Sequence, residues 1–205
     1  MISRRKFIER SSLATIGACL ITIGGKGADE EEVIMTVTGS IHPSELKFTL
    51  SHEHILVDFI GADKVSKDRY QVEEVFNTAL PFLQDVKAKG CNTFVDCTPA
   101  YLGRDAQLLQ RLAKAAGLNI ITNTGYYGAR NGKFLPQHVH TETAGQIASR
   151  WVKEWKNGID GTEVKPGFIK SGVDNAPLTP VQQKIIDAAA LTHLATGLTI
   201  GVHTG

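Results

Sequence analysis

Cysteine, net charge and long hydrophobic runs are all scarce in this sequence. Its 205 residues include 3 cysteines, and 22 basic side chains nearly balance 21 acidic ones. Such a balance gives no electrostatic reason to expect nucleic acid or a membrane surface as a partner. No apolar run is long and glycine-free enough to predict a membrane span. The composition is typical of a globular protein with a sizeable core.

The few cysteines exclude a disulfide framework. Cys91 and Cys97 bracket one expected strand, and six extended residues span roughly 20 Å, which is far beyond the reach of a disulfide bond. Both are therefore expected to be small buried hydrophobic residues. The third, Cys19, follows Ile16-Gly17-Ala18, which resembles a loose lipoprotein box and leaves lipid anchoring at Cys19 as an alternative.

Residues 1–28 read as an export signal and not as part of the fold. A basic start, with the pair Arg4 and Arg5, precedes a weakly apolar run over residues 11–25. The paired arginines resemble a twin-arginine signal, which predicts an exported protein, periplasmic or extracellular. A fortuitous basic start is the alternative. The folded domain is expected over residues 33–205.

Strand-like and helix-like segments alternate through this domain. Strands are expected at residues 48–58, 93–98, 119–124, 167–170 and 198–203. Helices are expected at residues 71–89, where Pro81 would kink or split the helix, and at 106–116, 141–158 and 180–197. Asp105 and Gly117 are suited to cap the second helix, and Thr179 with Gln182 forms a capping-box pattern before the last.

This alternation predicts parallel βαβ units and an α/β fold. A doubly wound sheet would give the same alternation, but no Gly-rich phosphate fingerprint follows the first strand. The sequence therefore favours a (β/α)8 TIM barrel, of which about five strands are present.

Two histidines on the first expected strand are candidate metal ligands. His52 and His54 are two residues apart, so they share a face of an extended strand. Neutral imidazole is a preferred ligand of Zn²⁺ and similar ions. The pattern alone is weak, because His138 and His140 repeat it in a segment expected to be a mobile loop near the mouth of the site.

Lys170 and His203 lie near the carboxyl ends of two later strands, where parallel α/β folds place their chemistry. Lys170 shares a face with Phe168, and burial there would favour its neutral amine. A neutral lysine can react with carbon dioxide to give a carbamate with two anionic oxygens. The alternatives are an ordinary strand-end lysine that reaches solvent and a histidine that hydrogen-bonds to a loop.

Residues 52–58, 96–128, 167–172 and 198–205 together resemble the phosphotriesterase family of the amidohydrolase superfamily, including Gly103-Arg104-Asp105. The resemblance implies a barrel with two divalent metal ions, usually zinc. It assigns His52 and His54 to the more buried ion, carboxylated Lys170 to a bridge between both ions, and His203 to the more exposed ion. A hydroxide between the ions would attack phosphorus or a carbonyl carbon.

The same resemblance places Tyr126 and Tyr127 at the substrate pocket, although packing is the commoner role of such residues. It implies a small-molecule substrate, either a phosphotriester, a carboxylic ester or a lactone, and a possible homodimer. A lactonase is a serious alternative to a phosphotriesterase, because many relatives look like lactonases.

The sequence departs from the family in two ways. It lacks the histidine of strand six and the aspartate of strand eight, and a TIM barrel needs roughly 250 residues. We therefore expect a fragment of a longer enzyme that is unstable and inactive alone. The alternatives are a non-catalytic exported metal-binding half barrel and a remnant without a site.

Overall fold

A computed structural model describes residues 32–204. The predicted signal peptide and Cys19 lie outside the described residues, and so does the sequence on which the predicted export route depends. The strands are β1 (Ile34–Thr36), β2 (Gly39–Ile41), β3 (Thr49–Glu53), β4 (Thr93–Asp96), β5 (Asn119–Ile121), β6 (Asn123–Thr124), β7 (Phe168–Val173) and β8 (Thr199–Thr204). The α-helices are α2 (Val72–Ala88), α3 (Ala106–Ala116), α4 (His138–Thr141), α5 (Ala144–Asn157) and α6 (Pro180–Thr196).

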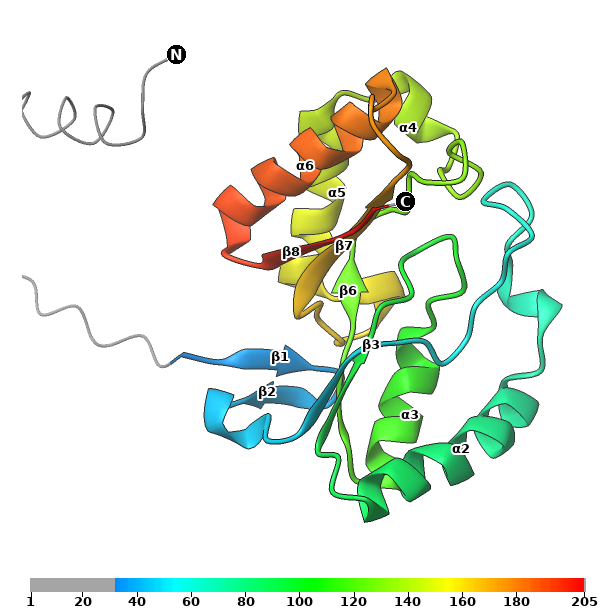
Figure 1. The fold of residues 1–205 in the computed structure, drawn as a ribbon, viewed down its shortest axis with the longest axis vertical. Helices are drawn as coiled ribbons and strands as arrows, with labels where there is room; N and C mark the ends of the chain where they lie inside the picture. The colour runs from blue at the N-terminus through cyan, green and yellow to red at the C-terminus, as the bar shows by residue number, and fades with distance from the viewer. Residues whose placement is uncertain (1–31, 205) are drawn as a thin grey trace, which may run out of the picture. The chain divides into compact units, whose positions relative to one another are not determined.

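After the β1–β2 hairpin, the strands form a curved parallel wall (Figure 1). One sheet has the order β3-β4-β5 and the other has the order β6-β7-β8. Only Thr122 separates β5 from β6, so the third expected strand is present but broken there. The strand order follows the chain order throughout, as in a (β/α) barrel. The α/β barrel-type prediction is confirmed, and the wall does not close within residues 32–204.

The helices pack on the outside of this wall and form two hydrophobic cores. α2 and α3 cover the β3–β5 sheet around Leu112 and Ile120, while α5 and α6 cover the β6–β8 sheet around Trp151 and Ile185 (Figure 1). All four side chains are buried. Burial of large apolar side chains on one face of each helix holds it against the strands.

Several helix ends follow local rules that the sequence already displays. The Asp105 side chain accepts from the amides of Gln107 and Leu108 at the start of α3, and Gly117 ends the helix with a φ of 65°. Thr179 and Gln182 form the expected capping box of α6. Pro81 lies within a continuous α2, so of the two predicted alternatives, a kink or a split, the split does not occur.

Other boundaries differ from the predictions. β3 ends at Glu53, before the predicted end at Asp58, and its register with β4 shifts between Leu50 and Glu53. β7 continues three residues beyond Lys170, so this lysine is not at the end of its strand. α5 begins at Ala144 because Thr143 and Gln146 supply a capping box. The segment with His138 and His140, expected to be a loop, forms the short helix α4.

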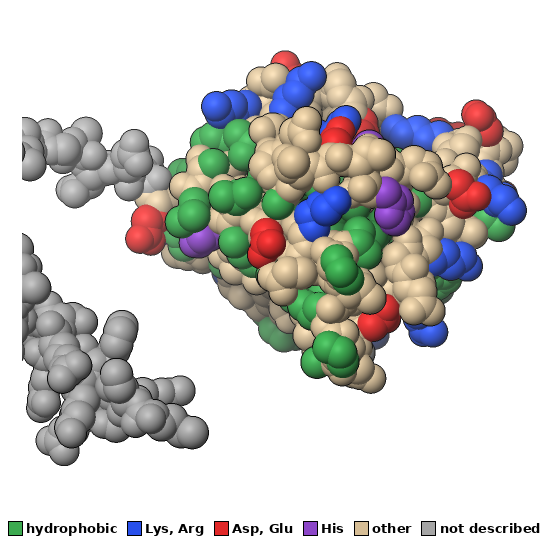
Figure 2. Space-filling view, turned by 90° about the horizontal axis from the view of Figure 1, so that it is seen from above, with side chains coloured by type: hydrophobic (Ala, Val, Ile, Leu, Met, Phe, Trp, Pro, Cys, Tyr) green, Lys and Arg blue, Asp and Glu red, His purple; other side chains and the backbone are tan. Residues whose placement is uncertain are grey.

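The concave face of the wall is open to solvent. His52, His54 and His203 are all exposed, whereas Cys91 and Cys97 are buried free thiols, as predicted. On the face that Figure 2 shows, hydrophobic, basic and acidic side chains are interspersed around surface histidines. No helix within residues 32–204 is long and apolar enough to cross a membrane.

Candidate metal centre and substrate cavity

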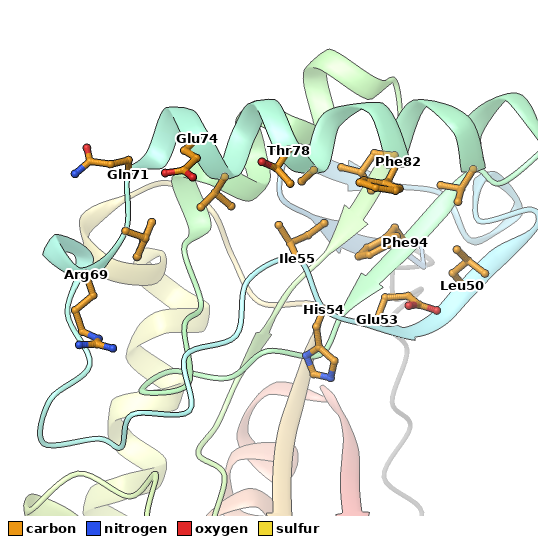
Figure 3. A pocket seen from close by; sticks show the side chains of 15 residues that line it. Leu50, Glu53, His54, Ile55, Arg69, Gln71, Glu74, Thr78, Phe82 and Phe94 are labelled. Carbon is orange, nitrogen blue, oxygen red and sulfur yellow. The ribbon is translucent and has the colours of Figure 1, made fainter.

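His52 lies in β3 and His54 lies one residue beyond its end. In Figure 3, His54 points to the side of the strand opposite the one on which Ile55 and Phe94 face α2. The ring centroids of His52 and His54 are 5.5 Å apart. Leu50, which strict alternation would place on the histidine side, instead packs against the core beneath α2. The bulge in β3 therefore does not prevent the two imidazoles from lying next to each other.

Lys170 and His203 reach the same region from β7 and β8. These strands pair in parallel, with Lys170 opposite Gly201 and Gly172 opposite His203. Residues two apart share a face of a strand, so Lys170 and His203 lie on one side of this pair. Gly125, with a φ of 116°, packs directly against the backbone of Lys170. A larger residue would not fit there, because its Cβ would overlap the Lys170 carbonyl oxygen.

The four side chains line a single cavity of about 650 Å³. Its walls are His52, His54, Val57, Phe59, Cys97, Leu102, Tyr127, Arg130, Lys133, Phe134, Lys170 and His203. The Lys170 side-chain nitrogen lies 3.5 Å from Nε2 of His52. The structure thus brings all four predicted metal-site residues together.

The surroundings favour the neutral forms of these groups. Partial desolvation by neighbouring protein atoms, followed by the charge of Lys170, lowers the pKa of His52, although its side chain is exposed. Partial desolvation, followed by the charge of His52, lowers the pKa of His54, which is also exposed. Lys170 is 5% exposed, and burial lowers the pKa of its amine. A neutral imidazole or amine has a free lone pair, which a metal ion or carbon dioxide requires.

A chain of hydrogen bonds extends behind His54. Its Nδ1 lies 2.9 Å from Oγ1 of Thr98, and the Thr98 hydroxyl lies 3.3 Å from a carboxyl oxygen of Asp96. Asp96 also accepts the backbone amide of Ile55 at 3.0 Å. Burial raises the pKa of Asp96 to about 7. These contacts fix the orientation of the His54 ring.

Tyr126 and Tyr127, the two tyrosines of the β6–α4 loop, lie in different surroundings. Tyr127 lines the cavity, with its ring packed over Gly172 and 5.5 Å from the His203 ring. Tyr126 is buried in the core beside Trp151, and its hydroxyl lies 3.1 Å from His138. The structure therefore places Tyr127, and not Tyr126, among the walls of the histidine cavity. His138 packs with Tyr126 outside that cavity.

A second cavity, of about 660 Å³, lies between α2 and the β3–β4 pair (Figure 3). Its walls are mainly apolar and include Phe82, Leu83 and Phe94. The imidazole of His54 points away from these side chains in Figure 3. The walls of this cavity also include polar side chains, namely Glu53, Arg69, Tyr70, Gln71, Glu74 and Thr78.

The donor set of the histidine cavity fits a divalent cation as a partial coordination sphere. Three imidazoles suit zinc-like ions, and beside them burial lowers the pKa of the Lys170 amine. Within residues 32–204, no three His, Cys, Asp or Glu side chains lie close enough together to hold an ion by themselves. Lys170 is a further candidate donor, because its side-chain nitrogen lies 3.5 Å from Nε2 of His52.

Parallel strands in chain order, with a histidine and lysine cluster on one cavity, place this chain among the α/β proteins of barrel type. The chain belongs to the phosphotriesterase family, whose model matches residues 32–205. It is 34% identical over 158 residues to the phosphotriesterase homology protein of Escherichia coli. The matched region covers 77% of this chain and 52% of that protein.

Two further relatives support this membership. The chain is 32% identical to the aryldialkylphosphatase of Saccharolobus solfataricus, over 80% of this chain and 52% of that protein. It matches the structure of a mutant organophosphorus hydrolase from Deinococcus radiodurans with a TM-score of 0.76 and 28% identity, over 84% of this chain and 53% of that one. The chain spans about half the length of the curated relatives it matches.

Several cavity residues were not expected from the sequence. Phe59, Arg130, Lys133 and Phe134 lie on irregular loops, where no periodicity indicates which way a side chain points. Cys97 was expected to be buried and is, but its contribution to the cavity wall was not expected. For Arg130, Lys133 and Phe134, the basic and aromatic composition of the segment between Gly125 and Pro136 was the sequence signal that could have indicated a cavity wall.

Proposed function

We propose that this chain carries the metal-binding part of a metal-dependent hydrolase that cleaves an ester bond of a small molecule. The bond is a phosphoester, a carboxylic ester or a lactone. The observation that supports this proposal is the convergence of His52, His54, Lys170 and His203 on one cavity. Membership of the phosphotriesterase family supports it independently.

Each residue has a distinct role in this proposal. His52 and His54 would hold one cation and His203 a second. The lowered pKa of His52 and of His54 favours the neutral imidazole that metal binding requires. Two divalent cations, zinc by ligand type, would supply an activated hydroxide and polarise the oxygen of the substrate. Tyr127 and the apolar walls would position the substrate beside the cluster.

Lys170 would serve as a long carboxylate. Its neutral amine nitrogen adds to the carbon of carbon dioxide, an N–C bond forms, and one proton leaves the nitrogen for solvent. The resulting carbamate offers two anionic oxygens in place of one amine. Burial of Lys170 lowers the pKa of its amine, which favours the reactive neutral form.

Metal content and hydrolysis test the proposal together. We expect purified protein to bind zinc, measured by mass spectrometry after dialysis, and the double substitution of His52 and His54 by Ala to remove at least half of it. His140→Ala, an exposed histidine outside the cavity, is the control. Hydrolysis is measured on a 4-nitrophenyl phosphotriester, a 4-nitrophenyl carboxylic ester and a lactone.

The outcomes separate the candidate functions. Equal zinc in the double variant and the wild type would overturn the metal site. Zinc lost by the variant, without hydrolysis of any substrate class by the wild type, would favour the non-catalytic metal-binding alternative. A preference for the lactone over the phosphotriester would assign the lactonase alternative.

A further inference from the structure

Two basic side chains line the cavity in addition to the metal-site cluster. Arg130 and Lys133 both belong to the loop that joins β6 to α4, and both are exposed. They lie on the wall that also contains Phe59, Tyr127 and Phe134. Cationic and aromatic groups therefore occur together beside the reactive cluster.

The backbone holds this loop in place. The amides of Arg130 and Asn131 donate to the two carboxylate oxygens of Asp174, at 2.7 and 3.0 Å. Both residues have a positive φ, of 57° and 55°. The carbonyl of Lys133 accepts the amide of Ala62 at 3.0 Å, which ties the loop to the segment after β3. The cations are thus presented on an ordered segment and not on a free tail.

The charge of the cavity is not balanced by acidic side chains. No Asp or Glu is among the cavity walls formed by the described residues. Within the same residues, Arg130 and Lys133 form no ion pair. Asp174, which follows β7, is the acid that contacts the loop, and its carboxylate also accepts the side chain of Gln182 at 2.9 Å. Two basic side chains on a cavity wall that carries no acid among the described residues attract an anionic ligand.

The aromatic side chains of the cavity wall also restrict which ligands fit the cavity. The rings of Phe59 and Phe134 contact each other edge to face at 6.1 Å between centroids, and Tyr127 packs against Phe134 at 5.9 Å. The Lys133 side-chain nitrogen lies 5.6 Å from the centre of the Phe134 ring. A ligand that fits this wall has an apolar body and a charged end.

We propose that the substrate is an ester or lactone that carries a separate anionic group, either a phosphate or a carboxylate, on an apolar body. Arg130 and Lys133 bind the anionic group, the aromatic wall holds the body, and the scissile bond faces the histidine and lysine cluster. The part of this statement that concerns the scissile bond rests on the proposed function. The preference for an anion rests on the cavity alone.

Binding of a matched pair of probes to metal-free protein tests the preference. Phenylphosphonate and its diethyl ester share the phenyl ring and differ in charge, and a chelator prevents the phosphonate from binding through a metal ion. By isothermal titration calorimetry, we expect phenylphosphonate to bind at least about tenfold more tightly than the diethyl ester. We expect a higher salt concentration to reduce this difference, because salt screens exposed charges.

Three substitutions locate the effect. Arg130→Gln and Lys133→Gln should each weaken phenylphosphonate binding about fivefold, as expected for loss of one charge-assisted contact at a partly exposed site. Neither should change binding of the diethyl ester. Lys114→Gln, which removes the same charge from the exposed face of α3, should change neither affinity. Circular dichroism confirms that each variant is folded.

The results distinguish this proposal from the proposed function. Equal affinity for both probes, or equal loss in all three variants, would overturn the anion preference even if the protein hydrolyses esters. Preserved anion binding at Arg130 and Lys133 in a protein that neither binds zinc nor hydrolyses any ester would overturn the hydrolase and retain the anion site.

Discussion

At the scale of single residues, the contacts behind His54 determine which of its nitrogens faces the cavity. Above the pKa of Asp96, about 7, the carboxylate accepts a hydrogen bond from the Thr98 hydroxyl. The Thr98 oxygen then accepts from Nδ1–H of His54. This arrangement leaves Nε2 without a proton and free to bind a metal ion.

Replacing Thr98 tests this tautomer. At pH 8, we expect long-range ¹H–¹⁵N NMR to show the Nδ1–H form of His54 in the wild type and a shift toward the Nε2–H form in Thr98→Val. Zinc affinity should fall by about tenfold or more, the usual effect of losing a hydrogen bond behind a metal ligand. Thr98→Ser keeps the hydroxyl and should keep the tautomer. The same tautomer in all three proteins would contradict the assignment.

Asp96 should give the folded protein a distinctive pH dependence. Burial raises the pKa of its carboxyl from about 3.8 to about 7. The folded state therefore holds a proton that the unfolded state has released, and the stability this provides is complete below about pH 4 and is lost as the pH rises through 7.

Asp96→Asn removes this pH dependence. We expect the free energy of unfolding of the variant, relative to the wild type, to increase between pH 4 and pH 8, by up to about 4 kcal/mol for a shift of three pH units. Urea denaturation at both pH values measures it. Ionisation of the histidines outside this chain of hydrogen bonds affects both proteins equally and cancels in the difference. A constant difference would show that Asp96 is ionised throughout this range.

At the scale of elements, a buried ion pair joins the start of α3 to α5 and β6. Arg104, whose side chain is 1% exposed, donates to Glu154 at 2.6 Å and to the Asn123 carbonyl at 2.7 Å. Thr124 of β6 donates to the same Glu154 carboxylate at 2.6 Å. Glu154 thereby orients the strand that leads to Gly125, which packs against Lys170.

Glu154→Ala should be strongly destabilising. It leaves Arg104 buried with only Asp160, 3.8 Å away, as an acidic neighbour. We expect a loss of about 3 kcal/mol in the free energy of unfolding, measured with urea. Asp85→Asn removes the exposed i,i+4 pair with Lys89 and should cost less than about 0.5 kcal/mol. Equal losses in the two variants would contradict the buried role of Glu154.

The elements also show what local sequence can and cannot determine. The bounds of α3 were predictable because Asp105 and Gly117 mark its two ends with side-chain and backbone geometry. The register shift within β3 was not predictable, because it depends on how β3 pairs with β4. The gathering of His52, Lys170 and His203 followed from strand order, whereas Arg130 and Lys133 depend on the Asp174 contacts of an irregular loop.

At the scale of the whole described region, the outer strands and helices leave apolar surface exposed. β3 and β8 each pair on one side only within residues 32–204. Phe82 of α2 is 71% exposed, Leu194 of α6 is 80% exposed and Val202 of β8 is 40% exposed. Unpaired strand edges flanked by apolar side chains favour association between chains.

We therefore expect this chain to self-associate, with a mass that rises with concentration in analytical ultracentrifugation. Val202→Lys places a charge on the β8 edge and should reduce this association. Thr199→Lys, an exposed position of the same strand, tests whether any charge on β8 is sufficient. A monomer at all concentrations, or no effect of Val202→Lys, would contradict a role of this edge in association.

Asp174 holds the β6–α4 loop through the amides of Arg130 and Asn131 and leaves their side chains out of the contact. The contacts between Asp174 and the loop are therefore made by the loop's backbone and not by the charged groups of its side chains. Single codon changes at Arg130 or Lys133 can alter the charge of the cavity while the frame around His52 and Lys170 stays intact. The loop is a place where substrate preference can evolve in small steps without a new fold.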